Sequence, residues 1–144
     1  MVETIPGMPE EFMEVITVQG LIDESEEMLQ LMIHMLYEDI LKHAKVERTP
    51  RIEICRDLEA SYKAYYRVGD ELIVLSAVNL QNKDVEHLAF VLAHEVWHHK
   101  QWEDGETFED YITATVDVNA YRAQRIEEEA DMFALHLFPN GQKG

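Results

Sequence analysis

His94-Glu95-Val96-Trp97-His98, the stretch HEVWH, places two histidines four residues apart, with a glutamate directly after the first. On an α-helix, residues four apart project from the same face, so both imidazoles can bind one ion while the glutamate lies beside it. This H-E-x-x-H pattern is typical of zinc sites in which the glutamate acts as a general base. The chain has 7 histidines, and chance alone produces the pattern in about one of twenty such sequences. The interpretation therefore needs a helical context and a third ligand.

The composition indicates a single domain with a substantial core. Of the 144 residues, 47% are hydrophobic and 28% charged, and the net charge is −17. This charge argues against binding to nucleic acid or to anionic membranes, and favours either a basic partner or simple solvation. A lone cysteine, Cys55, fits a reducing cytosol, and we find neither a signal peptide nor an apolar run of the ~20 residues that cross a bilayer. We expect one cytoplasmic domain over residues 1–144, with residues 1–10 as a flexible arm.

The first half of the chain predicts one long helix. Apolar residues at three- and four-residue spacing indicate a helix over residues 24–45, with Asp23 and Glu26 as an N-terminal capping box. We expect its methionines to fill the core; they are Met28, Met32 and Met35. Residues 12–18 fit either a short strand or the lead into this helix.

Three β-prone runs follow Pro50, at residues 51–55, 60–68 and 71–76. Gly69-Asp70 predicts a hairpin turn between the last two runs. We take residues 71–76 as a candidate edge strand, to which an extended peptide could be added.

The motif itself lies in a predicted amphipathic helix over about residues 84–102. Asn82 or Asp84 can cap its start, and residues 103–105 (Glu-Asp-Gly) end it. A polar connector at residues 79–83 precedes it. Its expected buried side consists of Leu88, Phe90, Val91, Leu92 and Val96.

Helical propensity returns after Thr107, which forms a capping box with Asp110, and persists to Phe138. An unbroken helix over this span would be about 46 Å long, too long for a small domain, so we expect a break near residues 117–120. An apolar stripe marks the second half, at Ile126, Ala130, Phe133, Ala134 and Leu137. The predicted fold is α+β, with a short twisted sheet packed on three helices.

The second half also contains candidates for a third metal ligand. Glu127 and Asp131 lie four residues apart and share a helix face. If Glu127 binds the ion, Asp131 can accept a hydrogen bond from a liganding histidine. Glu128 and Glu129 point about 100° and 200° away from Glu127 and are weaker candidates.

Two segments resemble a known family. H-E-x-x-H followed by E-x-x-A-D is the pattern of the gluzincins. Residues 126–139, IEEEADMFALHLFP, and the approach to the motif, LAFVLAHEVWHH, are similar to the corresponding segments of the ImmA/IrrE metallopeptidases. The similarity covers roughly residues 72–139. It departs from the family at Trp97, where the family usually has glycine, and at Trp102, where it usually has a further histidine.

The resemblance implies a zincin-like fold and one zinc ion, bound by His94, His98 and Glu127. It implies that Glu95 is the catalytic base and that Asp131 orients a liganding histidine. It also implies hydrolysis of a protein substrate, commonly a helix-turn-helix repressor. The alternative is a non-catalytic, zinc-stabilised interaction protein of the same fold.

Other polar residues receive weaker assignments. Tyr121 and His136 are possible donors to the oxyanion of a reaction intermediate. His99 points away from the metal face of the helix and is expected to be exposed. His87 lies on the metal face, two turns before His94, and is expected to line the helix without binding metal. The oligomeric state does not follow from the sequence.

Overall fold

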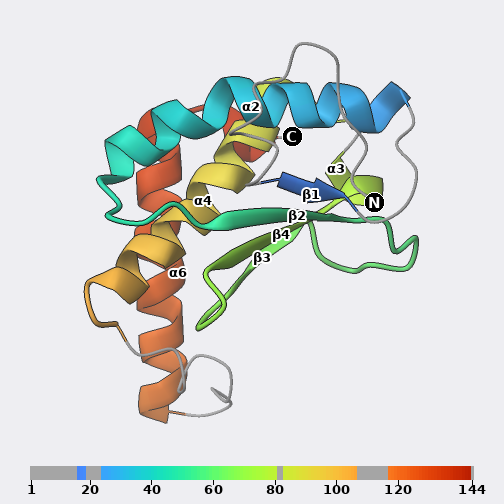
Figure 1. The fold of residues 1–144 in the computed structure, drawn as a ribbon. Coiled ribbons are helices and arrows are strands. Elements are labelled where there is room, and N and C mark those ends of the chain that lie inside the picture. The colour runs from blue at the N-terminus through green and yellow to red at the C-terminus, as the bar shows by residue number, and fades with distance from the viewer. Residues whose placement is uncertain (1–15, 19–23, 81–82, 107–116, 144) are drawn as a thin grey trace.

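The structure, a computed structural model, describes residues 16–18, 24–80, 83–106 and 117–143 (Figure 1). It is an α+β fold, as the sequence predicts. The elements in chain order are β1 (Ile16–Val18), α2 (Glu24–Ala44), β2 (Arg51–Cys55), β3 (Ala64–Arg67), β4 (Leu72–Ser76), α3 (Ala77–Leu80), α4 (Val85–Glu103), α6 (Asp117–Leu137) and the 3-10 helix η1 (Gly141–Lys143).

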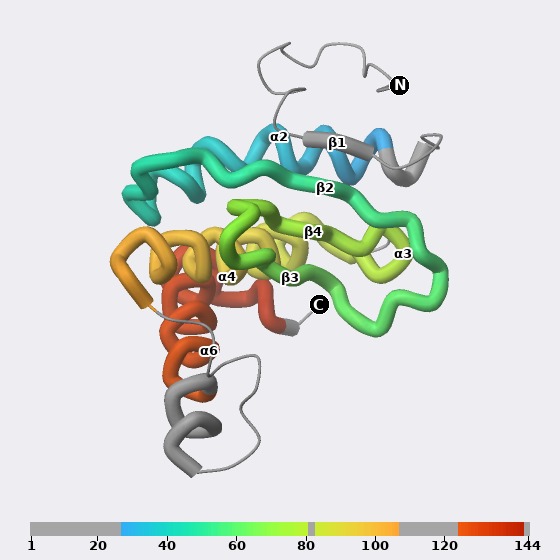
Figure 2. The backbone as a smooth tube through the Cα atoms, turned by 60° about the horizontal axis from the view of Figure 1, so that its bottom comes forward, coloured from blue at the N-terminus to red at the C-terminus, as the bar shows by residue number. Residues whose placement is uncertain are grey.

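Within the described residues the strands form one sheet of four, in the order β1-β2-β4-β3. β1, β2 and β4 are parallel, and β3 is antiparallel to β4. The pairing of Ile52 with Ile73, and of Ile54 with Leu75, places these side chains on one face of the sheet. All four are fully buried in the core, because α2 and α4 pack against this face (Figure 2).

The expected edge strand at residues 71–76 is wrong. β4 lies between β2 and β3, and all five of its residues are buried, as a continuous apolar run on a central strand requires. The edge strands of the described sheet are β1 and β3, and β3 is also shorter than the predicted run of residues 60–68. The hairpin at Gly69-Asp70 is confirmed, and Gly69 adopts φ +92°, a left-handed conformation that glycine accepts without a steric penalty.

α4 is the central helix of the molecule. It packs against α2, α6, β3 and η1, and the predicted buried side is confirmed, together with further buried residues on its other faces. On α6, Ile126, Ala130 and Ala134 are fully buried, and the two alanines leave room for a close approach to α4. The described helices include none that is both long and apolar enough to span a membrane.

Some details of the helices differ from the prediction. Met28 and Met35 are 57% and 74% exposed; only Met32 packs against the core, because the apolar stripe of α2 is narrower than its methionine content suggests. Residues 77–80 form the short helix α3, so the first two residues of the connector predicted at 79–83 are helical. α6 begins at Asp117, where a break was expected. The capping boxes at Asp23 and Thr107 lie outside the described residues.

Candidate metal site

α4 positions the two histidines of the motif on one face. Asp84 caps the helix, its side chain accepting a hydrogen bond from the backbone N–H of His87 at 2.8 Å. The Nε2 atoms of His94 and His98, one turn apart, lie 3.1 Å from each other. α6 packs across α4 and places a third side chain, 29 residues after His98, next to these two nitrogen atoms.

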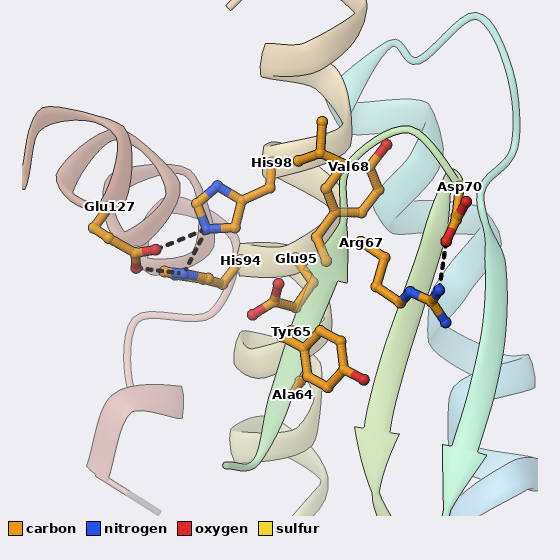
Figure 3. Close-up of a pocket in the computed structure, with 10 residues that line it drawn as sticks. Ala64, Tyr65, Arg67, Val68, Asp70, His94, Glu95, His98 and Glu127 are labelled. Atoms are coloured by element: carbon orange, nitrogen blue, oxygen red, sulfur yellow. Dashed lines mark hydrogen bonds and ion pairs between the residues drawn. The ribbon is translucent and has the colours of Figure 1, made fainter. Parts of the chain in front are cut away.

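That group is the carboxylate of Glu127, the residue predicted as the third ligand. Its two oxygens lie 2.9 Å from Nε2 of His94 and 3.1 Å from Nε2 of His98. Figure 3 shows the carboxylate pointing from α6 toward both rings. The three side chains form a group that could bind a metal ion.

Both histidines are oriented through their other ring nitrogen. Nδ1 of His94 donates to Oδ1 of Asp131 at 2.8 Å, as predicted for Asp131. Nδ1 of His98 donates to Oε1 of Gln101 at 2.9 Å, and the Gln101 amide donates to the carbonyl of Ile126 at 3.1 Å. Because both Nδ1 atoms carry hydrogen, both Nε2 atoms can present lone pairs to an ion. Gln101 was missed by the sequence analysis, although it lies three residues after His98 on the same helix face.

The donor set fits zinc. Two imidazole nitrogens and one carboxylate oxygen are the ligands of many catalytic zinc sites, which leave a fourth position open. Bonds of about 2.0–2.1 Å in tetrahedral geometry place ligand atoms about 3.3 Å apart. The two Nε2 atoms, now 3.1 Å apart, would need to separate by only a few tenths of an ångström, and one ligand atom from each of the three side chains lies within 4.8 Å of the other two.

The electrostatics favour a positive charge between these groups. Burial lowers the pKa of His94, but the hydrogen bond to Glu127 and the negative charges of Glu95, Glu127 and Asp131 outweigh it and raise the pKa to about 9. A bound cation would take the place of that proton. For Glu95, burial is the largest influence and raises the pKa, against the lowering effect of His98 and His94. A carboxylate with a raised pKa is a better proton acceptor.

Glu95 is 6% exposed and lines a cavity of about 720 Å³ together with the three cluster residues (Figure 3). The opposite wall is the edge strand β3 and its hairpin, residues 64–68 and Asp70. A second cavity of about 500 Å³ also includes Ala64, His94 and Glu95 and extends toward residues 61–63. The cluster therefore lies inside a cleft that runs along β3.

The structure separates the remaining candidates from the cluster. Glu128 accepts a hydrogen bond from Gln124 at 2.9 Å, and Glu129 pairs with Arg125 at 2.9 Å. His136 is exposed and lines a different cavity, so it is not placed to stabilise an oxyanion. The side chain of Tyr121 lies outside the described part of the structure.

The prediction that His99 is exposed is wrong. Its side chain is completely buried, because α4 is covered on nearly all sides. The Tyr66 hydroxyl donates to its Nδ1 at 2.7 Å, and its Nε2 donates to the carbonyl of Arg48 at 2.7 Å. These contacts connect the edge strand, α4 and the segment before β2. Trp97 stacks on Phe133 of α6, with ring centroids 4.5 Å apart, and does not line the cavity of the cluster.

Comparison of the chain with models of known protein families, with curated proteins and with solved structures finds no match in any of the three.

Proposed function

We propose that this protein is a zinc-dependent metalloendopeptidase. The observation that carries the proposal is the joint position of four groups. The ring nitrogens of His94 and His98 and the carboxylate oxygens of Glu127 approach one another to 2.9–3.1 Å. The buried carboxylate of Glu95 lies beside these three side chains in a cleft. A structural zinc site has its coordination filled by protein and needs neither an adjacent buried carboxylate nor an accessible cavity.

In the proposed reaction, His94, His98 and Glu127 hold the ion, with Asp131 and Gln101 orienting the two rings. Zinc, when bound, acidifies a water molecule and polarises the peptide carbonyl. Glu95 takes a proton from the attacking water and delivers it to the leaving amine. The surroundings of Glu95 favour the first transfer, because burial raises the pKa of its carboxyl group.

The edge strand β3 is the proposed docking site for the substrate backbone. No described strand pairs with its outer side, so its free N–H and C=O groups can pair with an extended peptide. Such a peptide would lie along the cleft, with its central peptide bond near the cluster. Tyr65, 38% exposed on β3, lines this cleft and is available to contact a substrate side chain.

The resemblance to the ImmA/IrrE metallopeptidases supports a cytoplasmic protein substrate, in particular a helix-turn-helix repressor. Trp97, the main departure from that family, supports the same proposal, because it packs on Phe133 and leaves the cluster's cavity open.

The test combines metal content with cleavage. We expect elemental mass spectrometry to find about one zinc per chain in the wild type and in Glu95→Gln, and almost none in His98→Ala. Only the wild type should cleave a library of quenched fluorescent peptides. A wild type that binds no zinc even after reconstitution contradicts the proposal. Zinc binding without cleavage of any peptide favours the non-catalytic interaction protein.

A further inference from the structure

His87 and Lys63 form a polar pair at one end of the cleft, outside the metal cluster. His87 is only 4% exposed and lies on α4 two turns before His94. Its Nδ1 donates to the carbonyl of Gly141 at 2.6 Å, because a carbonyl oxygen can only accept. Its Nε2 therefore carries a lone pair, which accepts a hydrogen bond from Nζ of Lys63 at 2.9 Å.

The orientation of His87 depends on the close approach of Gly141. A Cβ at that position would lie 2.5 Å from Cβ of Phe90 and 2.6 Å from the carbonyl oxygen of Glu86. Glycine alone fits there, and its carbonyl fixes the imidazole ring. The ring in turn holds the ammonium group of Lys63 at the wall of the cavity that also contains His94 and Glu95.

Lys63 keeps hydrogen-bond donors for a ligand. Within the described residues it forms no ion pair with a carboxylate, whereas Arg67, at the other end of β3, is paired with Asp70 at 2.7 Å. An ammonium group has three donors, and His87 accepts one of them. In a chain with net charge −17, a cation that faces a cleft without an acidic partner is suited to recognise an anionic group of a ligand.

We infer that Lys63 selects substrates with a carboxylate on the C-terminal side of the scissile bond. The inference rests on the proposed peptidase function and specifies its substrate. An extended peptide antiparallel to β3, the more stable mode of strand pairing, has its C-terminal part at the Lys63 end of the strand. The Lys63 ammonium group thus selects a carboxylate at this end of the cleft, although Glu95 and Asp131 line the same cavity and the net charge of the whole chain favours basic partners.

The geometry also limits where the carboxylate lies. Two turns of helix separate His87 from His94, which is about 10 Å. An extended peptide covers this distance in about three residues. The carboxylate is thus an acidic side chain within three residues after the cleaved bond, or the C-terminus of a short substrate. The same Lys63 contact serves both.

A peptide library tests the inference. Quenched fluorescent peptides vary the three positions after the cleaved bond among Glu, Gln and Lys, each with a free or an amidated C-terminus. For the zinc-loaded full chain we expect kcat/KM about tenfold higher for peptides with Glu than with Gln. Lys63→Met should abolish the preference, and Lys63→Glu should shift it toward Lys. Lys83→Glu, an equal charge change at an exposed residue outside these cavities, should leave it unchanged.

A binding measurement separates this inference from the proposed function. Glu95→Gln with zinc should bind labelled Glu peptides more tightly than Gln peptides by fluorescence anisotropy, and adding Lys63→Glu should reverse the order. If no peptide is cleaved but this binding pattern holds, the peptidase proposal fails and the carboxylate site stands. If the Glu and Gln peptides are cleaved and bound equally, or if the Lys63 variants keep the wild-type preference, the inference is overturned. The free and amidated peptides distinguish an acidic side chain from a C-terminus.

Discussion

Asp131 provides the sharpest test of how the metal cluster is built. Its carboxylate accepts a hydrogen bond from Nδ1 of His94 at 2.8 Å and makes no direct contact with the other ring nitrogen that would bind zinc. Asp131→Leu removes the acceptor and leaves all three ligands in place. Loss of such an orienting partner lowers metal affinity by about 10–100-fold, which is about 1.4–2.7 kcal/mol.

The exposure of Asp131 decides where in this range the effect lies. The side chain is 39% exposed, so water can replace part of the lost hydrogen bond, and we expect about a tenfold loss. Asp131→Asn keeps an acceptor oxygen, so its zinc affinity should fall by less, about threefold or under. Zinc affinity is measured by competition with a chromogenic chelator at pH 7.5.

Glu128→Gln is the matched control for Asp131→Asn. It removes one negative charge from the same helix at an exposed residue that pairs with Gln124, so its zinc affinity should equal that of the wild type. The reasoning is refuted if Asp131→Leu binds zinc as tightly as the wild type, or if Glu128→Gln weakens binding as much as Asp131→Leu does.

Three further predictions concern the cluster and its support. Glu127→Gln should weaken zinc binding by at least about 100-fold in the same chelator assay, because this carboxylate is a direct ligand; an affinity within tenfold of the wild type would contradict its role. Gln101→Leu should lower zinc affinity about tenfold by releasing Nδ1 of His98, with circular dichroism to verify folding; unchanged affinity would exclude an orienting role. Burial raises the carboxyl pKa of Glu103, but hydrogen bonds from the backbone N–H groups of Glu47 and Arg48, in the segment before β2, outweigh burial and lower it. A lowered pKa stabilises the fold above the unfolded-state value and loses that contribution as the pH falls through the folded-state value. Glu103→Gln should therefore lower the free energy of unfolding by about 1–2 kcal/mol at pH 7, and by progressively less below about pH 4. Urea unfolding of the wild type and the variant, at pH 7 and below pH 4, measures this difference. A difference that does not change with pH would contradict the assignment.

The elements that the sequence predicted best are those whose pattern is local. The apolar period of residues 24–45 and the capped helix around the motif agree with α2 and α4 to within a residue or so, because helix geometry depends on neighbours three and four positions away. β2 agrees with its prediction at both ends. The same local rule placed His94 and His98 on one face and selected Glu127 over Glu128.

The predictions that failed concern contacts between distant segments. Residues 71–76 were assigned to a sheet edge, but strand order follows from which strands pair and is not encoded in the run itself. His99 was expected on the surface, but its face of α4 is covered by Tyr66 and the carbonyl of Arg48. An amphipathic pattern does not identify the polar faces that other elements cover.

The sequence by itself thus determined the motif, its helix, the α+β class and the residue types available to a metal ion. Only the tertiary structure decided that Gln101 orients His98, that β3 is the edge beside the cluster, and that Lys63 is held by His87 in the cleft. The physical reason is the range of the interactions. Helical and strand periods arise from backbone geometry within a few residues, whereas these contacts depend on the packing of elements that are far apart in the chain.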